Sequence, residues 1–212
     1  MKRAPRTGRA PWMGRAAGWA GLAASLVGLG WTWRAQADGA AAPARRAAAL
    51  AAATSSVGPV SIHTTPGAIP VSLVIPRLGV LAPIRPVGMD ASGRMATVPD
   101  ARVVAWYAAG PAPGEPGNAL LAGHRDWNGA LGALWTLPAL RPGDDVYIAT
   151  QAGLREHFRA ASVQVYPADA VPDTVMDLGG PARVTLITCT GAFDRAAGGY
   201  VDRAVAVLTP AG

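Results

Sequence analysis

Residues 183–208 read RVTLITCTGAFDRAAGGYVDRAVAVL and contain two strand-like runs that indicate the type of fold. The first run covers residues 183–188 and the second covers residues 200–208, with glycines and polar residues between them. Both are short and apolar with β-branched residues, which is typical of strands, whereas helices usually need longer periodic segments. This stretch therefore predicts β structure in the C-terminal part of the chain.

The same pattern extends back along the chain to about residue 70. Further candidate strands occupy residues 71–75, 83–88, 103–107, 118–122, 145–149 and 155–166. Long helices are not expected because 26 glycines and 19 prolines interrupt the 212 residues, and helical turns are expected only near 130–138 and 169–176. About eight short strands indicate an all-β fold that forms one β-barrel domain.

The basic charge of the chain is concentrated at its N-terminus. The formal net charge is +6, but six basic residues and no acidic residue lie within the first 34 positions. The remainder carries equal numbers of basic and acidic groups, so it offers no basic surface for phosphates. Nucleic acid is therefore not an expected partner.

An apolar segment follows the first basic residues. Residues 1–15 carry five cations, and the next 18 residues are uncharged up to Arg34. As a helix these 18 residues would span about 27 Å, close to the bilayer core of about 30 Å. We expect a basic cytoplasmic tail at 1–15 and a transmembrane signal-anchor at 16–34, with the rest of the chain outside the cell.

Cleavage of this segment is the alternative, because Ala35-Gln36-Ala37 resembles a signal-peptidase site. The apolar run is longer than the core of an ordinary signal peptide, which favours a retained anchor. Either form exports the domain that follows. The remaining boundaries are an Ala/Pro-rich linker at 35–68 and a catalytic domain at 69–210.

Three residues lie at the ends of apolar runs and could act together. His124 follows the run 118–122, Cys189 follows the run 183–188, and Arg203 begins a row shared with Val205 and Val207. A cysteine nucleophile needs a neighbouring group that exchanges protons, and the oxyanion that it forms needs a fixed positive donor. The combination indicates covalent catalysis by Cys189 without a metal or another cofactor.

The other residues of these types receive structural interpretations. Cys189 is the only cysteine, so an intramolecular disulfide and paired-cysteine metal sites are excluded. His63, before the domain, and His157, within a candidate strand, are expected to be ordinary hydrogen-bonded histidines.

Several motifs in this order resemble those of the sortase family. Thr185-Leu186-Ile187-Thr188-Cys189 is similar to the family's T-L-x-T-C strand end, Ala122-Gly123-His124 is similar to its histidine motif, and an arginine follows on the last strand. The wider pattern is most similar to the actinobacterial class F, through residues 75–80, 87–90, 111–117, 140–144, 193–194 and 199–200. The resemblance covers residues 70–209.

The resemblance implies an eight-stranded sortase barrel and a membrane-anchored transpeptidase. By this resemblance, Cys189 attacks the threonine carbonyl of an L-P-x-T-G-type sorting signal, His124 exchanges protons with the amines, and Arg203 holds the oxyanion. The thioester is then released by an amine of a peptidoglycan precursor or of another protein. The expected partners are thus sorting-signal peptides, an amine acceptor and the membrane.

Two positions depart from the class F pattern. Class F proteins often carry arginine at the position of Val201 and asparagine at that of Arg203. Since positions 201 and 203 should share a strand face, Arg203 is the best candidate and Arg195 a weaker one. Thr190-Gly191 also replaces the more usual Gly-Gly, which restricts the backbone slightly.

Three other interpretations compete with a sortase. L,D-transpeptidases carry their cysteine in an S-x-G-C motif, which residues 188–191 lack. Papain-like peptidases place cysteine before histidine, whereas His124 precedes Cys189 here. The remaining alternative is a membrane-tethered, non-enzymatic β module for adhesion or scaffolding, in which Cys189 is only structural.

Overall fold

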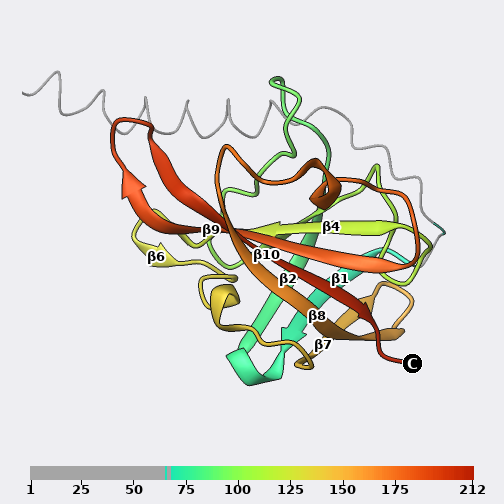
Figure 1. The fold of residues 1–212 in the computed structure, drawn as a ribbon. Coiled ribbons are helices and arrows are strands. Elements are labelled where there is room, and N and C mark those ends of the chain that lie inside the picture. Colours follow the sequence, from blue (N-terminus) through green and yellow to red (C-terminus); the bar gives the residue numbers. More distant parts are fainter. Residues whose placement is uncertain (1–64, 66–67) are drawn as a thin grey trace, which may run out of the picture. The chain divides into compact units, whose positions relative to one another are not determined.

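Eight strands close into a barrel in the computed structural model, which describes residue 65 and residues 68–212 (Figure 1). Their order around the barrel is β1-β2-β3-β4-β9-β10-β8-β7. Their bounds are β1 Pro70–Ile75, β2 Val80–Val87, β3 Val104–Tyr107, β4 Asn118–Gly123, β7 Asp145–Thr150, β8 Arg155–Pro167, β9 Arg183–Asp194 and β10 Gly199–Pro210. The predicted all-β, eight-stranded barrel is therefore confirmed.

The remaining elements are short. A separate hairpin consists of β5 Asp126–Trp127 and β6 Ala130–Leu131, and 3₁₀ turns occupy η1 Pro76–Leu78, η2 Leu137–Ala139 and η3 Asp173–Val175. The turns η2 and η3 correspond to the two predicted helical turns. Within the described part of the chain, no helix has the length and apolar character needed to cross a bilayer. The predicted tail, anchor and most of the linker, with His63, lie outside the described residues.

Two of the barrel's neighbouring strand pairs determine where the functional residues meet. Strands β4 and β9 are parallel, with Ala122 opposite Ile187, so their C-terminal ends lie at the same end of the barrel. Strands β9 and β10 are antiparallel, and this pairing places Cys189 directly opposite Arg203. The three predicted site residues consequently lie on, or directly after, three adjacent strands at one end of the barrel.

Side chains fill the interior of the barrel. Along β2 buried and exposed residues alternate from Val80 to Arg85, as expected for a strand with one face towards a core. The largest fully buried side chains are Trp106 and Phe158, and the Trp106 indole nitrogen donates a 3.1 Å hydrogen bond to the Pro111 carbonyl. The interior is therefore a packed core, and the functional pocket must lie at its edge.

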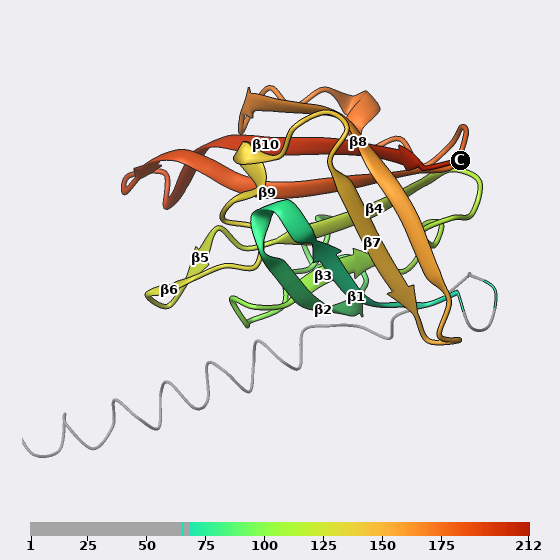
Figure 2. The same ribbon diagram turned by 90° about the horizontal axis from the view of Figure 1, so that it is seen from below.

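The end of β9 differs from the prediction. Its expected end was residue 188, but β9 continues to Asp194 and pairs with the start of β10. Every residue from Gly191 to Asp194 is exposed, and Figures 1 and 2 both show the two strands projecting beyond the barrel. Cys189 therefore lies inside a strand, although it is at the rim of the barrel core.

A β-bulge marks the start of this projection. Tyr200 pairs with Phe193 and Asp202 pairs with Thr190, so Val201 opposes two residues of β9, Gly191 and Ala192. Gly191 has φ +79°, which a residue with a side chain adopts only at a cost. A Cβ atom at Gly191 would also overlap the Asp202 carboxylate. The bulge thus requires glycine at this position.

We expect Gly191→Ala to lower the free energy of unfolding by about 1–3 kcal/mol, because strain and overlap add at one residue. Chemical denaturation followed by circular dichroism measures this loss. Gly198→Ala is the matched control, since Gly198 also has positive φ (+68°) but open space around its Cα. Equal destabilisation by the two substitutions would contradict the role of the Asp202 contact.

Candidate active site

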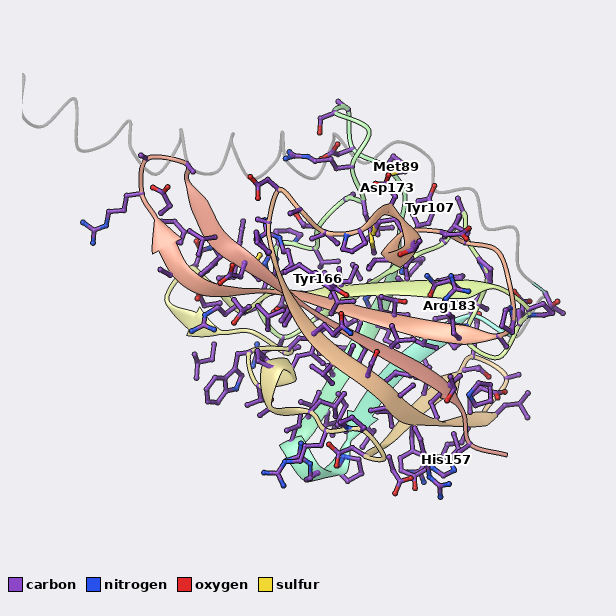
Figure 3. All side chains as sticks on the ribbon, viewed as in Figure 1. Met89, Tyr107, His157, Tyr166, Asp173 and Arg183 are labelled. Carbon is purple, nitrogen blue, oxygen red and sulfur yellow. The ribbon has the colours of Figure 1, made fainter. Side chains whose placement is uncertain are left out.

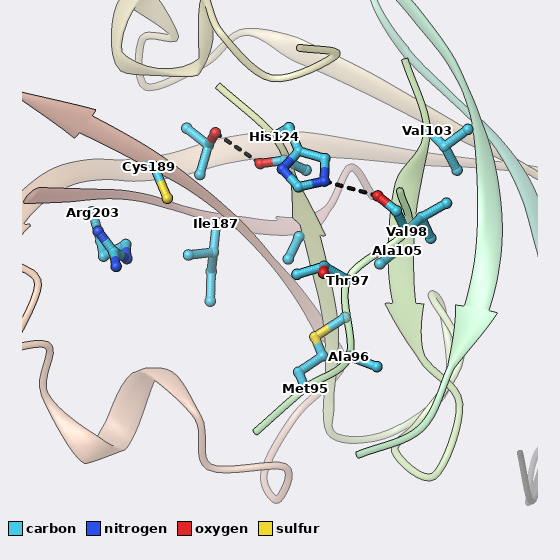
Figure 4. Close-up of a pocket in the computed structure, with 13 residues that line it drawn as sticks. Met95, Ala96, Thr97, Val98, Val103, Ala105, His124, Ile187, Cys189 and Arg203 are labelled. Atoms are coloured by element: carbon cyan, nitrogen blue, oxygen red, sulfur yellow. Dashed lines mark hydrogen bonds between the residues drawn. The ribbon is translucent and has the colours of Figure 1, made fainter. Parts of the chain in front are cut away.

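The three predicted residues line one pocket. Cys189, His124 and Arg203 surround a cavity of about 160 Å³, which Figure 4 shows in close-up. The rest of the lining is mostly apolar and comes from the β2–β3 loop and from β3, β4 and β9: Met95, Ala96, Thr97, Val98, Val103, Ala105, Ala122, Gly123, Ile187 and Thr188. A sulfur, an imidazole and a guanidinium thus share one small, largely apolar site.

Cys189 and Arg203 are direct cross-strand partners. Side chains at directly opposed positions of antiparallel strands point to the same face, with Cβ atoms about 4.5–5.5 Å apart. Both side chains are partly buried, so each can meet a ligand while packing limits its freedom. The strand register therefore holds a guanidinium beside the thiol.

The Arg203 side chain is anchored by main-chain oxygens. Its Nη1 atom donates hydrogen bonds to the carbonyls of Tyr200, at 2.8 Å, and Asp202, at 2.9 Å. Among the described residues, no acceptor is bonded to its Nε or Nη2 atom. The guanidinium is thus fixed in place and keeps donors for a ligand.

His124 follows β4 directly, as predicted. Its Nε2 atom lies 2.8 Å from the Val98 carbonyl oxygen, a hydrogen bond that Figure 4 marks. Its ring also packs against Trp127, with centroids 4.7 Å apart and an interplanar angle of 30°. The imidazole is therefore held at one edge and on one face.

Thr188 joins the strands that carry Cys189 and His124. Its hydroxyl donates a 2.8 Å hydrogen bond to the Gly123 carbonyl, just beyond the last backbone pairing of β4 with β9. Thr188 is 2% exposed and Gly123 is partly buried, so without this bond the carbonyl would have only limited access to water. The threonine preceding the cysteine thus extends the β4–β9 contact by one side chain.

We expect Thr188→Val to lower the free energy of unfolding by about 1–3 kcal/mol, the usual cost of leaving a buried polar group unpaired. Denaturant unfolding measures the change. Thr188→Ser keeps the hydroxyl and should recover most of the stability. If the valine and serine variants unfold at the same denaturant concentration, the Gly123 bond contributes nothing measurable.

A second cluster lies just outside the pocket and was not predicted. The Tyr200 hydroxyl donates to the Asp126 carboxylate, and this bond raises the pKa of Tyr200 above its ordinary value. The Arg125 guanidinium lies 5.2 Å from the centre of the Tyr200 ring, and its Nη1 atom donates to Thr190 Oγ1 at 3.4 Å. The segment after His124 is thereby tied to β9 and β10 beside Cys189 and Arg203.

Only Arg203 among the candidate arginine positions lines the pocket. Residues 201 and 203 were expected to share one strand face, but the bulge interrupts the regular pairing at Val201, which is 42% exposed. Arg195, the weaker candidate, lies in the turn between β9 and β10 and is not part of the pocket lining.

The structural interpretation of His157 is confirmed. It lies on β8 (Figure 3), where its Nε2 atom is 2.8 Å from Asp145 Oδ1 and its ring stacks on Tyr147 with centroids 4.6 Å apart. This hydrogen bond, aided by Arg159, holds the pKa of Asp145 below its ordinary value. Within the described residues, no cluster of three or more His, Cys, Asp or Glu side chains could hold a metal ion.

Comparison with known proteins identifies the family. The sortase domain profile matches residues 73–211, a range that contains all three pocket residues. The chain belongs to the sortase family. It is accordingly a cysteine transpeptidase, and the non-enzymatic module is not favoured. Among curated protein sequences, none matches the chain significantly.

Solved sortases of several classes share the fold. The chain is similar to sortase C-1 from Actinomyces oris, with 20% identity over 67% of this chain and 73% of that one, and a TM-score of 0.51. Sortase D5 from Clostridium perfringens gives 21% identity, 72% and 83% coverage and 0.51. Sortase A from Listeria monocytogenes gives 20% identity, 68% and 88% coverage and 0.52. The likeness establishes the sortase barrel.

Proposed function

We propose that this sortase cleaves an L-P-x-T-G-type sorting signal between threonine and glycine, with Cys189 as nucleophile, His124 as proton carrier and Arg203 as oxyanion stabiliser. The observation that carries the proposal is the shared pocket, in which Cys189 and Arg203 are cross-strand partners. Cysteine, histidine and arginine in one site supply the three functions that acyl transfer through a thioester needs.

The first half-reaction forms the thioester. The Cys189 thiolate attacks the threonine carbonyl carbon, and the carbonyl oxygen becomes an oxyanion that accepts hydrogen bonds from the Arg203 guanidinium. The tetrahedral intermediate then collapses, the carbon–nitrogen bond breaks, and protonated His124 gives its proton to the departing glycine amine. The acyl group remains on the sulfur.

The second half-reaction transfers the acyl group to an amine. The incoming amine attacks the thioester carbonyl and gives its proton to neutral His124, while Arg203 again holds the oxyanion. The carbon–sulfur bond breaks, and Cys189 leaves as the thiolate that begins the next cycle. The acceptor is an amine of a peptidoglycan precursor or of another surface protein.

The pocket lining supports an apolar sorting signal. The walls of the cavity are apolar, so they suit the leucine and proline side chains of the signal better than charged ones. They include Val98, Val103, Ala105 and Ile187. Arg203 is the charged side chain of the lining, and its position opposite Cys189 suits the reacting carbonyl.

We assign the chain to a type similar to class F on its sequence motifs. The segments Ile75-Pro76-Arg77-Leu78-Gly79-Val80 and Leu140-Arg141-Pro142-Gly143-Asp144 support this subclass, while Val201 and Arg203 depart from it. The similar solved structures described above belong to classes A, C and D.

We further propose a cell-surface location with a single membrane span. The basic residues at 1–15 remain in the cytoplasm, residues 16–34 form the anchor, residues 35–68 the linker, and residues 69–210 the catalytic domain outside the cell. Sorting-signal proteins and cell-wall amines are accessible on that side of the membrane.

Mass spectrometry of reaction products tests the proposed function. The protein without residues 1–34 is incubated with a panel of sorting peptides and amines, and adducts are mapped. We expect Cys189 to carry the part of the peptide that ends at threonine, without the glycine and the residues after it. Added amine should then release this acyl group from the enzyme. Labelling of Cys189 that is indifferent to peptide sequence would instead support a module without this activity.

A further inference from the structure

The hydrogen bond at His124 identifies the role of each ring nitrogen. Nε2 lies 2.8 Å from the Val98 carbonyl oxygen, and a carbonyl oxygen only accepts hydrogen bonds. Nε2 must therefore carry a proton in both the neutral and the charged imidazole for this bond to persist. Nδ1 is then the nitrogen that gains and loses a proton.

The orientation of the ring agrees with this assignment. In Figure 4 the hydrogen bond to Val98 leaves the ring on the side away from Cys189, and the other ring nitrogen lies on the Cys189 side. A half-turn of the ring about its Cβ–Cγ bond would exchange Nδ1 with Cδ2 and Nε2 with Cε1. It would point a C–H group at the Val98 carbonyl and turn Nδ1 away from Cys189.

Trp127 is well placed to prevent that half-turn. Its indole packs against the His124 ring with centroids 4.7 Å apart, and Trp127 as a whole is 38% exposed. Aromatic pairs gain about 0.5–1.5 kcal/mol beyond their burial, which favours this plane of the ring, and the Val98 bond selects between the two half-turn orientations within it. Loss of the indole would open space beside the imidazole.

The hairpin that carries Trp127 is closed next to His124. Asn128 and Gly129 form its tight turn with positive φ values of 51° and 82°, and Trp127 pairs with Ala130. The Gly132 amide donates a 2.7 Å hydrogen bond to the Arg125 carbonyl, and a Cβ atom at Gly132 would overlap the main chain of His124. Trp127 thus belongs to a hairpin whose far end lies close against the His124 main chain.

We propose that Nδ1 of His124 exchanges the proton with the leaving and incoming amines, and that Trp127 and the Val98 carbonyl are the positioning groups that keep Nδ1 on the Cys189 side. This inference rests on the proposed function, since it assigns an atom to the role proposed for His124. Trp127 acts through His124 and takes no part in bond breaking.

Nitrogen NMR of the imidazole tests the assignment directly. In full-length protein labelled with ¹⁵N-histidine, a His124→Gln variant identifies the His124 signals by their disappearance. We expect the neutral ring to carry its proton on Nε2 and the charged ring to carry one on each nitrogen. A neutral ring protonated at Nδ1 would overturn the proposal.

Kinetics of Trp127 variants test the positioning role. We expect Trp127→Ala to lower kcat about tenfold or more with the KM for the sorting peptide within about twofold, because proton transfer and not binding is impaired. Trp127→Phe retains an aromatic face and should recover most of the rate. Trp135→Ala is the matched control, since Trp135 is 47% exposed in the same segment and lines a different groove.

The outcomes separate this inference from the proposed function. A Trp127→Ala variant with wild-type kcat would refute the positioning role while leaving acyl transfer by Cys189 intact. If the unmodified protein forms no acyl adduct on Cys189, the proposed function itself fails. Should Trp127→Ala prove unfolded by circular dichroism, Trp127→Leu, which keeps an apolar side chain without an aromatic face, replaces it in the same kinetic comparison, and the NMR tautomer decides the Nδ1 assignment.

Discussion

Cys189→Ala should abolish both the acyl adduct and the transpeptidation product, since the thioester cannot form without the sulfur. Alanine removes one partly buried atom from the rim of the barrel, so folding should be unaffected. Mass spectrometry of enzyme and products after incubation with a sorting peptide and an amine measures the loss. The expected residual rate is indistinguishable from that without enzyme.

The control for this prediction is the structural integrity of the variant. Cys189→Ala should keep the circular dichroism spectrum and the unfolding midpoint of the unmodified protein. It should also still bind the sorting peptide, because the apolar lining of the pocket is unchanged. Peptide cleavage by a folded alanine variant would exclude Cys189 as the nucleophile.

The strands were predictable from the sequence because each contains a short apolar run that is bounded by glycine, proline or polar residues. All eight predicted runs correspond to barrel strands. Strand β2 begins at Val80, three residues before the predicted run, and buried and exposed residues alternate from there to Arg85. The two parallel pairings are not local properties, since β2 and β3 are joined by the long loop 88–103 and several elements separate β4 from β9.

The projection of β9 and β10 beyond the core could not be predicted from hydrophobic periodicity. The residues from Gly191 to Asp194 are exposed and have no buried face, so their strand character comes from pairing with β10. A bulge at Gly191 redirects the pair, and the sequence signal for it is a single glycine beyond the predicted strand 183–188.

The reactive residues of the pocket could be predicted from the sequence, whereas the groups that hold His124 in position could not. Cys189, His124 and Arg203 are chemically distinctive and end or lead apolar runs, so both chemistry and position indicated them. The contribution of Val98 is a main-chain oxygen, which any residue provides, and therefore no side chain signals it. Trp127 was missed because its contact with His124 depends on the fold of the β5–β6 hairpin.

Arg203→Ala should lower kcat/KM by about 10²–10³, the usual effect of removing one oxyanion donor. Arg203→Lys should also be severely impaired, because an ammonium is a point charge and cannot reproduce the planar fork. The Nη1 bonds to the Tyr200 and Asp202 carbonyls hold that fork in position, and a lysine has one nitrogen that cannot stay at these carbonyls and also reach a substrate oxygen as Nε and Nη2 can. Steady-state kinetics with a fluorogenic sorting peptide measure both variants.

Arg195→Ala is the matched control for this prediction, because Arg195 carries the same group in the β9–β10 turn outside the pocket lining. It should retain nearly the full rate. Near-normal activity of Arg203→Ala together with a large loss in Arg195→Ala would reverse the assignment. That result would require the β9–β10 projection to fold over the pocket during catalysis, since the present register places Arg203, and not Arg195, opposite Cys189.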